Sequence, residues 1–330
     1  MKFNNYFLTG GGQSTPFVVV LLAVVAVLVF LFVRGLMKST NKMGYVVKTL
    51  RGILSYSWLI IMVLVVLTPV LWMVSASFTR GKTIDAVPII PDRRLFTLEH
   101  FKYIFEYKTI KSAAMADYPA AFLRTTGLAA LNTVLVLIFS TMSGFIFSRL
   151  RFKGRKNILL GMMVLQMFPS FMGMLALFMI FRTFGWLNNT YMLAIIYSVG
   201  SIPYNTFLVR GFMRSIPKSL DESAEIDGAS KMQTLFRIIL PLIVPILGFI
   251  AINAFMAPWM DYMLQSVFLQ SDSQTVAVWL YRTTDPFNTL HYNPLRFMAG
   301  ALLVAIPIML VQFYMQKYMV YGLTAGAEKG

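Results

Sequence analysis

Cysteine is absent from this 330-residue chain, and histidine occurs only twice. Without cysteine the chain can form neither a disulfide nor a thiolate metal site. The histidines, His100 and His291, stand in separate polar stretches with no carboxylate or second ligand at metal-binding spacing. We interpret both as exposed loop residues. Because no catalytic constellation is recognisable either, the sequence does not predict an enzyme.

Charged residues are scarce as well. They make up 13% of the chain, against about 25% in soluble domains, whereas hydrophobic residues make up 58% and the mean hydropathy is +0.69. This composition predicts an integral membrane protein. The net charge of +16 would suggest a nucleic-acid partner in a soluble protein. Here the basic residues flank apolar runs, as the positive-inside rule requires, so no nucleic-acid partner is expected.

Apolar runs of nearly spanning length recur along the chain, since a transmembrane helix needs about 20 residues. The runs predict an all-α integral membrane protein with about seven transmembrane helices. They are Pro16–Val33, Tyr56–Ser75, Gly127–Ser148, Ile158–Phe181, Tyr191–Phe212, Ile238–Trp259 and Phe297–Val320.

The short connection Arg149–Lys156, which reads RLRFKGRK, carries the strongest positive charge signal and is expected to face the cytoplasm. Counting helices from it places Met37–Arg51, Arg214–Arg237 and the C-terminal tail on the same side. The first run, with its positive flank on the cytoplasmic end, is predicted to be a retained anchor rather than a signal peptide. The connections predicted to face outward are Phe78–Thr125, Thr183–Thr190 and Asp261–Arg296.

A polar segment, Ser215–Pro241, interrupts the apolar pattern. Pro217 suits the first turn of a helix, and Gly228 can adopt the positive φ that ends one. The residues between them that recur at helical spacing are Leu220, Ala224 and Asp227. We expect a short amphipathic helix followed by a glycine turn.

A second helix is predicted directly after that turn. Ser230 and Gln233 form the spacing of a capping box, which begins a helix by satisfying its free N–H groups. The helix then runs through Ile238 and Leu240 into the next apolar run. A rigid rod of this kind at the membrane face can dock into a groove on another protein.

These residues resemble the hallmark of the permease subunits of binding-protein-dependent ABC importers, which reads E-A-A, three residues, Gly, nine residues, I-x-L-P. In this chain it reads Glu222-Ser223-Ala224, then Gly228, then Ile238-Ile239-Leu240-Pro241 at the full spacing, with Ser223 in place of the first Ala. Asp227 and Ala229 match the D-G-A of the family. The resemblance implies that the short helix contacts an ATPase. The residues assigned to that contact are Leu220, Glu222, Ser223, Ala224, Asp227, Gly228, Ala229, Ile238, Leu240 and Pro241.

Three further stretches, at Pro91–Phe101, Phe147–Lys156 and Tyr321–Gly330, are similar to carbohydrate importers, and most of all to the second permease subunit of maltose and malto-oligosaccharide transporters. The resemblance covers residues 52–330. It implies a six-helix type I importer core there, with a cytoplasmic coupling helix at about residues 217–228. Residues 1–51 are then an extra N-terminal span and a cytoplasmic linker.

The resemblance also implies the partners: a related permease subunit in a heterodimer, two ATP-binding-cassette ATPase subunits, an extracytoplasmic sugar-binding protein and an oligosaccharide, malto-oligosaccharide first. The location implied is the plasma (inner) membrane of a bacterium. No cofactor is expected on this chain, and ATP and Mg belong to the ATPase. The glycine-rich Gly10–Thr15 lacks the lysine of a phosphate loop and precedes an apolar run instead of following a strand.

Two sets of residues are weaker candidates. Neutral polar residues in the apolar runs either line a sugar pathway or hydrogen-bond helix to helix, at about 0.6 kcal/mol per contact. They are Asn132, Gln166, Asn205, Asn253 and Gln312. Residues of the last outward connection suit either contact with the binding protein, as the resemblance implies, or an interfacial aromatic belt. They are Trp279, Tyr281, Asp285, Asn288 and Tyr292.

Two rival functions have less support. A secondary transporter or channel working alone would need charged coupling residues inside the membrane, which are scarce here, and would not need the Glu222–Pro241 segment. A membrane-embedded enzyme would need a catalytic constellation.

Overall fold

The structure, a computed structural model, describes residues 42–84, 87–89, 92–106, 117–270, 272–287 and 292–327. The described residues form helices and loops, with an isolated antiparallel bridge between Thr79 and Phe96. The all-α prediction is therefore confirmed. The predicted run Pro16–Val33 lies outside the described residues.

The chain divides into two compact units, Met1–Val70 and Leu71–Gly330. The boundary falls inside helix α2 (Lys42–Ser77), which contains the predicted run Tyr56–Ser75. Residues 47–77 of α2 are long and apolar enough to cross a membrane. The functional division predicted after residue 51 lies within the same helix and stays a prediction.

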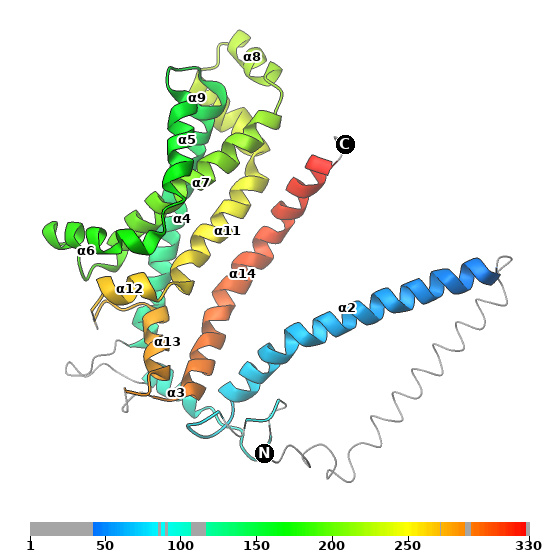
Figure 1. Ribbon diagram of the computed structural model, residues 1–330, viewed down its shortest axis with the longest axis vertical. Coiled ribbons are helices and arrows are strands. Elements are labelled where there is room, and N and C mark those ends of the chain that lie inside the picture. Colours follow the sequence, from blue (N-terminus) through cyan, green and yellow to red (C-terminus); the bar gives the residue numbers. More distant parts are fainter. Residues whose placement is uncertain are drawn as a thin grey trace. The chain divides into compact units, whose positions relative to one another are not determined.

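Four long helices form the body of the second unit: α4 (Tyr118–Arg149), α7 (Leu193–Ser215), α11 (Val244–Met260) and α14 (Pro294–Ala327). α4 packs against α7 and α11, and α11 packs against α14 (Figure 1). η2 (Thr190–Met192) leads into α7. Each of these four helices overlaps one of the predicted apolar runs.

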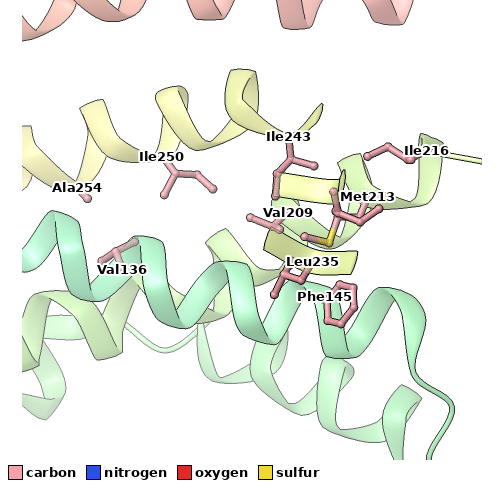
Figure 2. Packing of buried hydrophobic residues seen from close by; sticks show 10 residues of the cluster. Val136, Phe145, Val209, Met213, Ile216, Leu235, Ile243, Ile250 and Ala254 are labelled. Atoms are coloured by element: carbon pink, nitrogen blue, oxygen red, sulfur yellow. The ribbon is translucent and has the colours of Figure 1, made fainter. Parts of the chain in front are cut away.

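Gly144 lets α4 and α7 approach closely. A Cβ atom at this position would lie 2.5 Å from Cγ1 of Val209, nearer than two carbon atoms can approach. Beside this contact the two helices share a buried apolar cluster with α11 and the segment before it (Figure 2). Its labelled residues are Val136, Phe145, Val209, Met213, Ile216, Leu235, Ile243, Ile250 and Ala254.

The prediction of one continuous helix over Ile158–Phe181 is wrong. The structure has two helices, α5 (Arg155–Leu165) and α6 (Met174–Thr183), separated by a turn and the 3-10 helix η1 (Ser170–Gly173). Pro169 explains the break, because proline has no N–H and disfavours helical geometry at the residue before it.

The predicted run Ile238–Trp259 forms a bent pair of helical segments instead of one regular helix. α9 (Lys231–Thr234), the π-helix η3 (Leu235–Ile239) and α10 (Leu240–Leu242) form one segment, which meets α11 at 81°. Pro241 and Pro245 remove two helical N–H donors on either side of the bend. Over the described residues, four helices are long and apolar enough to span, or up to five if this bent pair is one span.

The two ends of the second unit differ. α8 (Ser219–Ile226) and α9 lie at one end, and α3 (Glu99–Glu106), α12 (Met263–Phe268) and α13 (Val276–Thr284) lie at the other (Figure 1). Two connections predicted to be cytoplasmic, Arg149–Lys156 and Arg214–Arg237, therefore share one end.

The interpretation of His100 as an exposed loop residue is wrong. Its side chain is 1% exposed, and Nε2 lies 2.8 Å from the carbonyl oxygen of Thr79, to which it donates. Burial lowers the pKa of this imidazole below its ordinary 6.5, against the opposing effects of the Thr79 hydrogen bond and Glu99. His291 lies outside the described residues.

Candidate functional site

The short helix predicted between Pro217 and Gly228 is confirmed as α8. Asp221 and Glu222 occupy its first turn, where their negative charges stabilise the positive end of the helix dipole. Gly228 ends it with a φ of +77°, as predicted. The amide of Gly228 donates to the carbonyl of Glu225 at 3.1 Å, and that of Ala229 to Ala224 at 2.9 Å. This pair of bonds is a Schellman motif, which fixes the direction of the chain after the helix.

The capping box is also confirmed. The Gln233 amide donates to Oγ of Ser230 at 3.3 Å, and the Ser230 amide donates to Oε1 of Gln233 at 2.7 Å. An ion pair between Lys231 and Glu225 spans the turn. Local hydrogen bonding thus defines both sides of the Gly228 turn.

Arg149, the last residue of α4, attaches α8 to the helix bundle. Its Nε lies 2.9 Å from Oδ2 of Asp221, and both side chains are largely buried, at 7% and 15% exposed. Its Nη2 also donates to the carbonyl of Ile216 at 3.2 Å. The beginning of α8 is therefore held against the end of α4, whereas the predicted site contained no residue of α4.

The two faces of α8 have different surroundings. Ala224 is 4% exposed and packs toward the chain, so its side chain does not belong to the outward face. At about 100° per residue, Ser219, Glu222 and Ile226 lie on the side of α8 opposite Ala224, with Ser223 at the edge of that side, and all four are exposed.

The outward face contains a residue that the sequence analysis missed. Ile226 is 86% exposed, and it is apolar whereas the other residues of the outward face are polar. An apolar residue just before a glycine helix stop, in an otherwise polar segment, was the available signal. Of the remaining predicted residues, Leu220, Asp227, Gly228 and Pro241 are exposed, and Ala229, Ile238 and Leu240 are half-buried.

A cavity of about 220 Å³ brings three of the five predicted pathway residues together: Asn132 on α4, Asn205 on α7 and Asn253 on α11. Nδ2 of Asn132 donates to the carbonyl of Ala254 at 2.7 Å. Its Oδ1 is buried and accepts no hydrogen bond from the described residues. Such an acceptor is costly when it is unpaired.

Aromatic residues complete the cavity wall, and these were not predicted. They are Tyr197, Tyr204 and Phe249. The wall contains no charged side chain. The other two predicted residues do not line it: Gln166 donates to the carbonyl of Gly200 at 2.7 Å, and Gln312 is exposed on α14.

Tyr197 also links the cavity to the end of α11. Its hydroxyl donates to Oδ2 of Asp261 at 2.9 Å and accepts from Nε2 of Gln265 at 2.9 Å. The same Nε2 donates to the carbonyl of Pro258 at 2.7 Å. These bonds connect α7, α11 and α12 at the cavity wall.

The residues predicted to contact the binding protein differ in how deeply they are buried. Trp279 is fully buried and packs edge-on against Tyr118, with ring centroids 4.8 Å apart, so it is a core residue and not a surface anchor. Tyr281 and Tyr292 are exposed, at 47% and 37%. Asn288 lies outside the described residues.

The end of this connection exposes a residue that the analysis did not name. Phe287 is 95% exposed, and its amide donates to Oδ1 of Asp285 at 3.0 Å. Tyr262 stacks on Tyr281 with ring centroids 4.0 Å apart. In the part of the chain that the structure describes, there is no group of three or more His, Asp or Glu residues able to hold a metal ion.

Known proteins are similar to this chain in sequence and in fold. The galactooligosaccharides transport system permease protein GanQ of Bacillus subtilis (strain 168) is 37% identical over 282 residues, covering 85% of this chain and 96% of the relative. The maltodextrin transport system permease protein MdxG of the same organism is 34% identical over 284 residues, covering 86% and 98%.

The fold is similar to that of a solved bacterial ABC transporter involved in the import of the acidic polysaccharide alginate. The TM-score is 0.62 with 22% identity, covering 82% of this chain and 96% of that chain. This likeness confirms a type I importer core. Residues 137–321 match the family described as "Binding-protein-dependent transport system inner membrane component". The chain therefore belongs to this family, as a permease subunit of the inner membrane, and the resemblance noted in its sequence is confirmed.

Proposed function

We propose that this chain is one of two related permease subunits of a bacterial ATP-driven oligosaccharide importer. It pairs with a second, different permease, two ATPase subunits that bind ATP and Mg, and an extracytoplasmic sugar-binding protein. The observation that carries this proposal is the position of α8: a helix held to the bundle by Arg149 at its beginning and stopped by Gly228, with an exposed outward face.

The outward face of α8 suits docking into a cleft of an ATPase. Glu222 supplies a charge for a hydrogen-bonded contact, and Ile226 supplies an apolar anchor at the end of the helix. Because α8 is attached to α4 through Arg149, movement of the docked helix would be transmitted to a membrane helix. This arrangement supports a coupling role.

In this proposal the end of the unit that contains α8, the Arg149–Lys156 connection and the C-terminal tail faces the cytoplasm. The positive charge of the two connections supports this orientation. The end with α3, α12 and α13 then faces outward, where Tyr281, Asp285, Phe287 and Tyr292 can contact the binding protein. Asn288, outside the described residues, is proposed for the same contact from the sequence alone.

The cavity between α4, α7 and α11 is proposed as part of the sugar pathway. Sugars offer many hydroxyl donors, and Oδ1 of Asn132 is a buried acceptor without a partner among the described residues. Ligand sites commonly combine a few polar groups with aromatic walls, as Asn253 and Phe249 do here. The absence of charge from the lining favours a neutral sugar.

The relatives' names extend the choice of substrate. One relative is named for galactooligosaccharides and the other for maltodextrin. We propose a neutral oligosaccharide and take malto-oligosaccharides and galactooligosaccharides as the two candidates to be compared directly.

The test is ATP hydrolysis by the complete importer, reconstituted with its binding protein and titrated with each sugar. We expect one of the two sugar series to stimulate hydrolysis and to be transported. Asn253→Leu should weaken transport, because Asn253 lines the cavity and its amide otherwise bonds only within its own helix, at 2.8 Å to Phe249. Gln312→Leu, outside the cavity, is the matched control.

Sugar transport by this chain alone, without ATP, would contradict the proposal and favour a solitary transporter. Equal transport by Asn253→Leu and the control would reject the cavity as the sugar pathway. It would not contradict coupling to an ATPase, which the stimulation of ATP hydrolysis tests separately.

A further inference from the structure

A second cavity, distinct from the proposed sugar pathway, lies between α5 and α7 at the α8 end of the unit. Its volume is about 670 Å³, within the range of about 300–1,000 Å³ typical of small-molecule sites. It contains no residue of the outward face of α8 and none of the sugar-pathway candidates. Neither docking nor sugar passage therefore accounts for it.

Four basic side chains line this cavity: Arg155 and Lys156 in the first turn of α5, and Arg210 and Arg214 one turn apart on α7. The lining includes no carboxylate, and no described carboxylate forms an ion pair with any of the four. Arg210 and Arg214 are four residues apart and lie on the same face of α7, and Arg155 and Lys156 line the same cavity from α5. Like charges so close together repel, and a bound anion would relieve the repulsion.

Backbone hydrogen bonds hold two of these cations in place. Nη1 of Arg155 donates to the carbonyl of Leu150 at 3.1 Å, and Nε of Arg210 donates to that of Phe147 at 3.1 Å. A guanidinium has five N–H donors, so most of those on Arg210 stay available to a ligand. The first turn of α5 adds the positive end of a helix dipole to the same place.

Apart from Asn157, the side chains that complete the wall are apolar, and some of them lie farther along the helices from the charged end. Met163 follows Arg155 by eight residues on α5, about 12 Å along the helix, whereas Phe207 precedes Arg210 by three residues and Arg214 by seven on α7, about 4.5 and 10.5 Å along it. Leu160 lies between these levels. All three apolar side chains are 39–51% exposed. The cavity is thus cationic at the end of the bundle and apolar toward its middle.

We propose that this cavity binds an anionic phospholipid. The phosphate lies among Arg155, Lys156, Arg210 and Arg214, and an acyl chain lies along Leu160, Met163 and Phe207. Basic pockets between membrane helices at the cytoplasmic interface suit such headgroups. Free phosphate would share the headgroup chemistry but would leave the apolar wall uncovered, so the amphipathic shape favours the lipid.

The test compares lipid retention by the complete importer in nanodiscs of phosphatidylcholine containing one-fifth phosphatidylglycerol, measured by native mass spectrometry. The variant is Lys156→Gln with Arg214→Gln, since neither side chain forms a hydrogen bond or ion pair with another described residue, so the fold should tolerate the change. The control is Arg151→Gln with Lys153→Gln, which removes the same amount of charge from the Arg149–Lys156 connection but outside the cavity.

We expect the cavity variant to retain at least about tenfold less phosphatidylglycerol than the control, as the loss of two charge contacts implies. Millimolar inorganic phosphate should not displace the lipid. Equal retention by the two variants would overturn the proposal, because the interaction would then be general surface attraction. Displacement by phosphate would assign the site to a free anion instead. A photo-crosslinker at Met163 that captured a partner subunit and no lipid would show a protein interface.

Discussion

At the scale of single residues, Gly228 is the position where conformation alone decides the outcome. A Cβ atom there would meet nothing within 4 Å, so a substitution costs backbone strain and not a clash. We predict that Gly228→Ala weakens the stop of α8 by about 1 to 2 kcal/mol, because an L-residue disfavours a φ of +77°. Gly228→Asn should be milder, since asparagine tolerates this conformation.

Hydrogen exchange of the backbone amides at positions 228 and 229 measures how far the helix stop is weakened. ATP hydrolysis stimulated by the binding protein measures the consequence for coupling. Faster exchange and weaker stimulation are expected for alanine, with asparagine in between. Identical exchange in both variants and the parent would show that the Schellman bonds do not depend on glycine.

His100 predicts a pH dependence. Because burial lowers its pKa in the folded chain below the ordinary 6.5, the unfolded segment binds more protons as the pH falls through this value. The stability contributed by neutral His100 is therefore complete above pH 6.5 and is lost progressively below it. Glu99 and Arg296 are the charged groups that act on the imidazole, in opposite directions.

The measurement is amide exchange at Arg80 and Thr97, whose backbone bonds to Leu95 and Phe78 are both 2.8 Å long. We expect their protection to fall between pH 7.5 and 5.5, after correction for intrinsic exchange. His100→Gln keeps an N–H donor without a titrating group and should abolish the pH dependence. The same loss of protection in that variant would assign the effect to another group.

Local chemistry explains which residues of the site the sequence could predict. The Gly228 stop and the Ser230 cap depend on neighbours within five residues, and both were predicted correctly. The inward orientation of Ala224 depends on how α8 lies against the rest of the chain, and the Arg149–Asp221 ion pair joins residues that are 72 positions apart. Long-range contacts of that kind leave no periodic signal in a single sequence.

At the scale of elements, the attachment of α8 to α4 gives a sharp prediction. Asp221→Asn leaves Arg149 largely buried without its counter-ion, and breaking such a pair costs about 3 to 5 kcal/mol. We expect α8 to detach locally, with faster amide exchange across residues 217–229 and weaker coupling of ATP hydrolysis to transport. The swap Arg149→Asp with Asp221→Arg should restore part of both.

For amide exchange the matched control is Asp227→Asn, which removes a carboxylate from the same segment at an exposed position. If Asp227→Asn and Asp221→Asn have equal effects, net charge and not the ion pair holds α8. If the charge swap restores nothing, the geometry of the guanidinium, which also donates to Ile216, is what matters.

Element boundaries were harder to predict than element type. Apolar runs predict helices well because the bilayer requires internal hydrogen bonding, and this holds for α4, α7 and α14. The same runs conceal breaks, since lipid-facing residues are apolar on both sides of a proline. Pro169 ends a helix, whereas Pro203 lies inside α7, so the presence of proline alone does not decide the outcome.

At the scale of the whole molecule, orientation in the membrane is the prediction on which the proposed roles depend. The described part of the chain contains no cysteine, and neither does the rest of the sequence, so single cysteines can be introduced without background. Arg151→Cys and Ser223→Cys lie at exposed positions of the α8 end, and Arg94→Cys and Phe287→Cys at exposed positions predicted to face outward. With a membrane-impermeant maleimide, we expect the first pair to react only after the membrane is opened and the second pair to react in intact spheroplasts.

Because Ser223 lies on the outward face of α8, its protection should increase further when the ATPase subunits are bound. Reaction of Ser223→Cys from outside would show that the chain has the opposite orientation in the membrane. α8 could then not contact a cytoplasmic ATPase, and the mechanism proposed for coupling would be wrong.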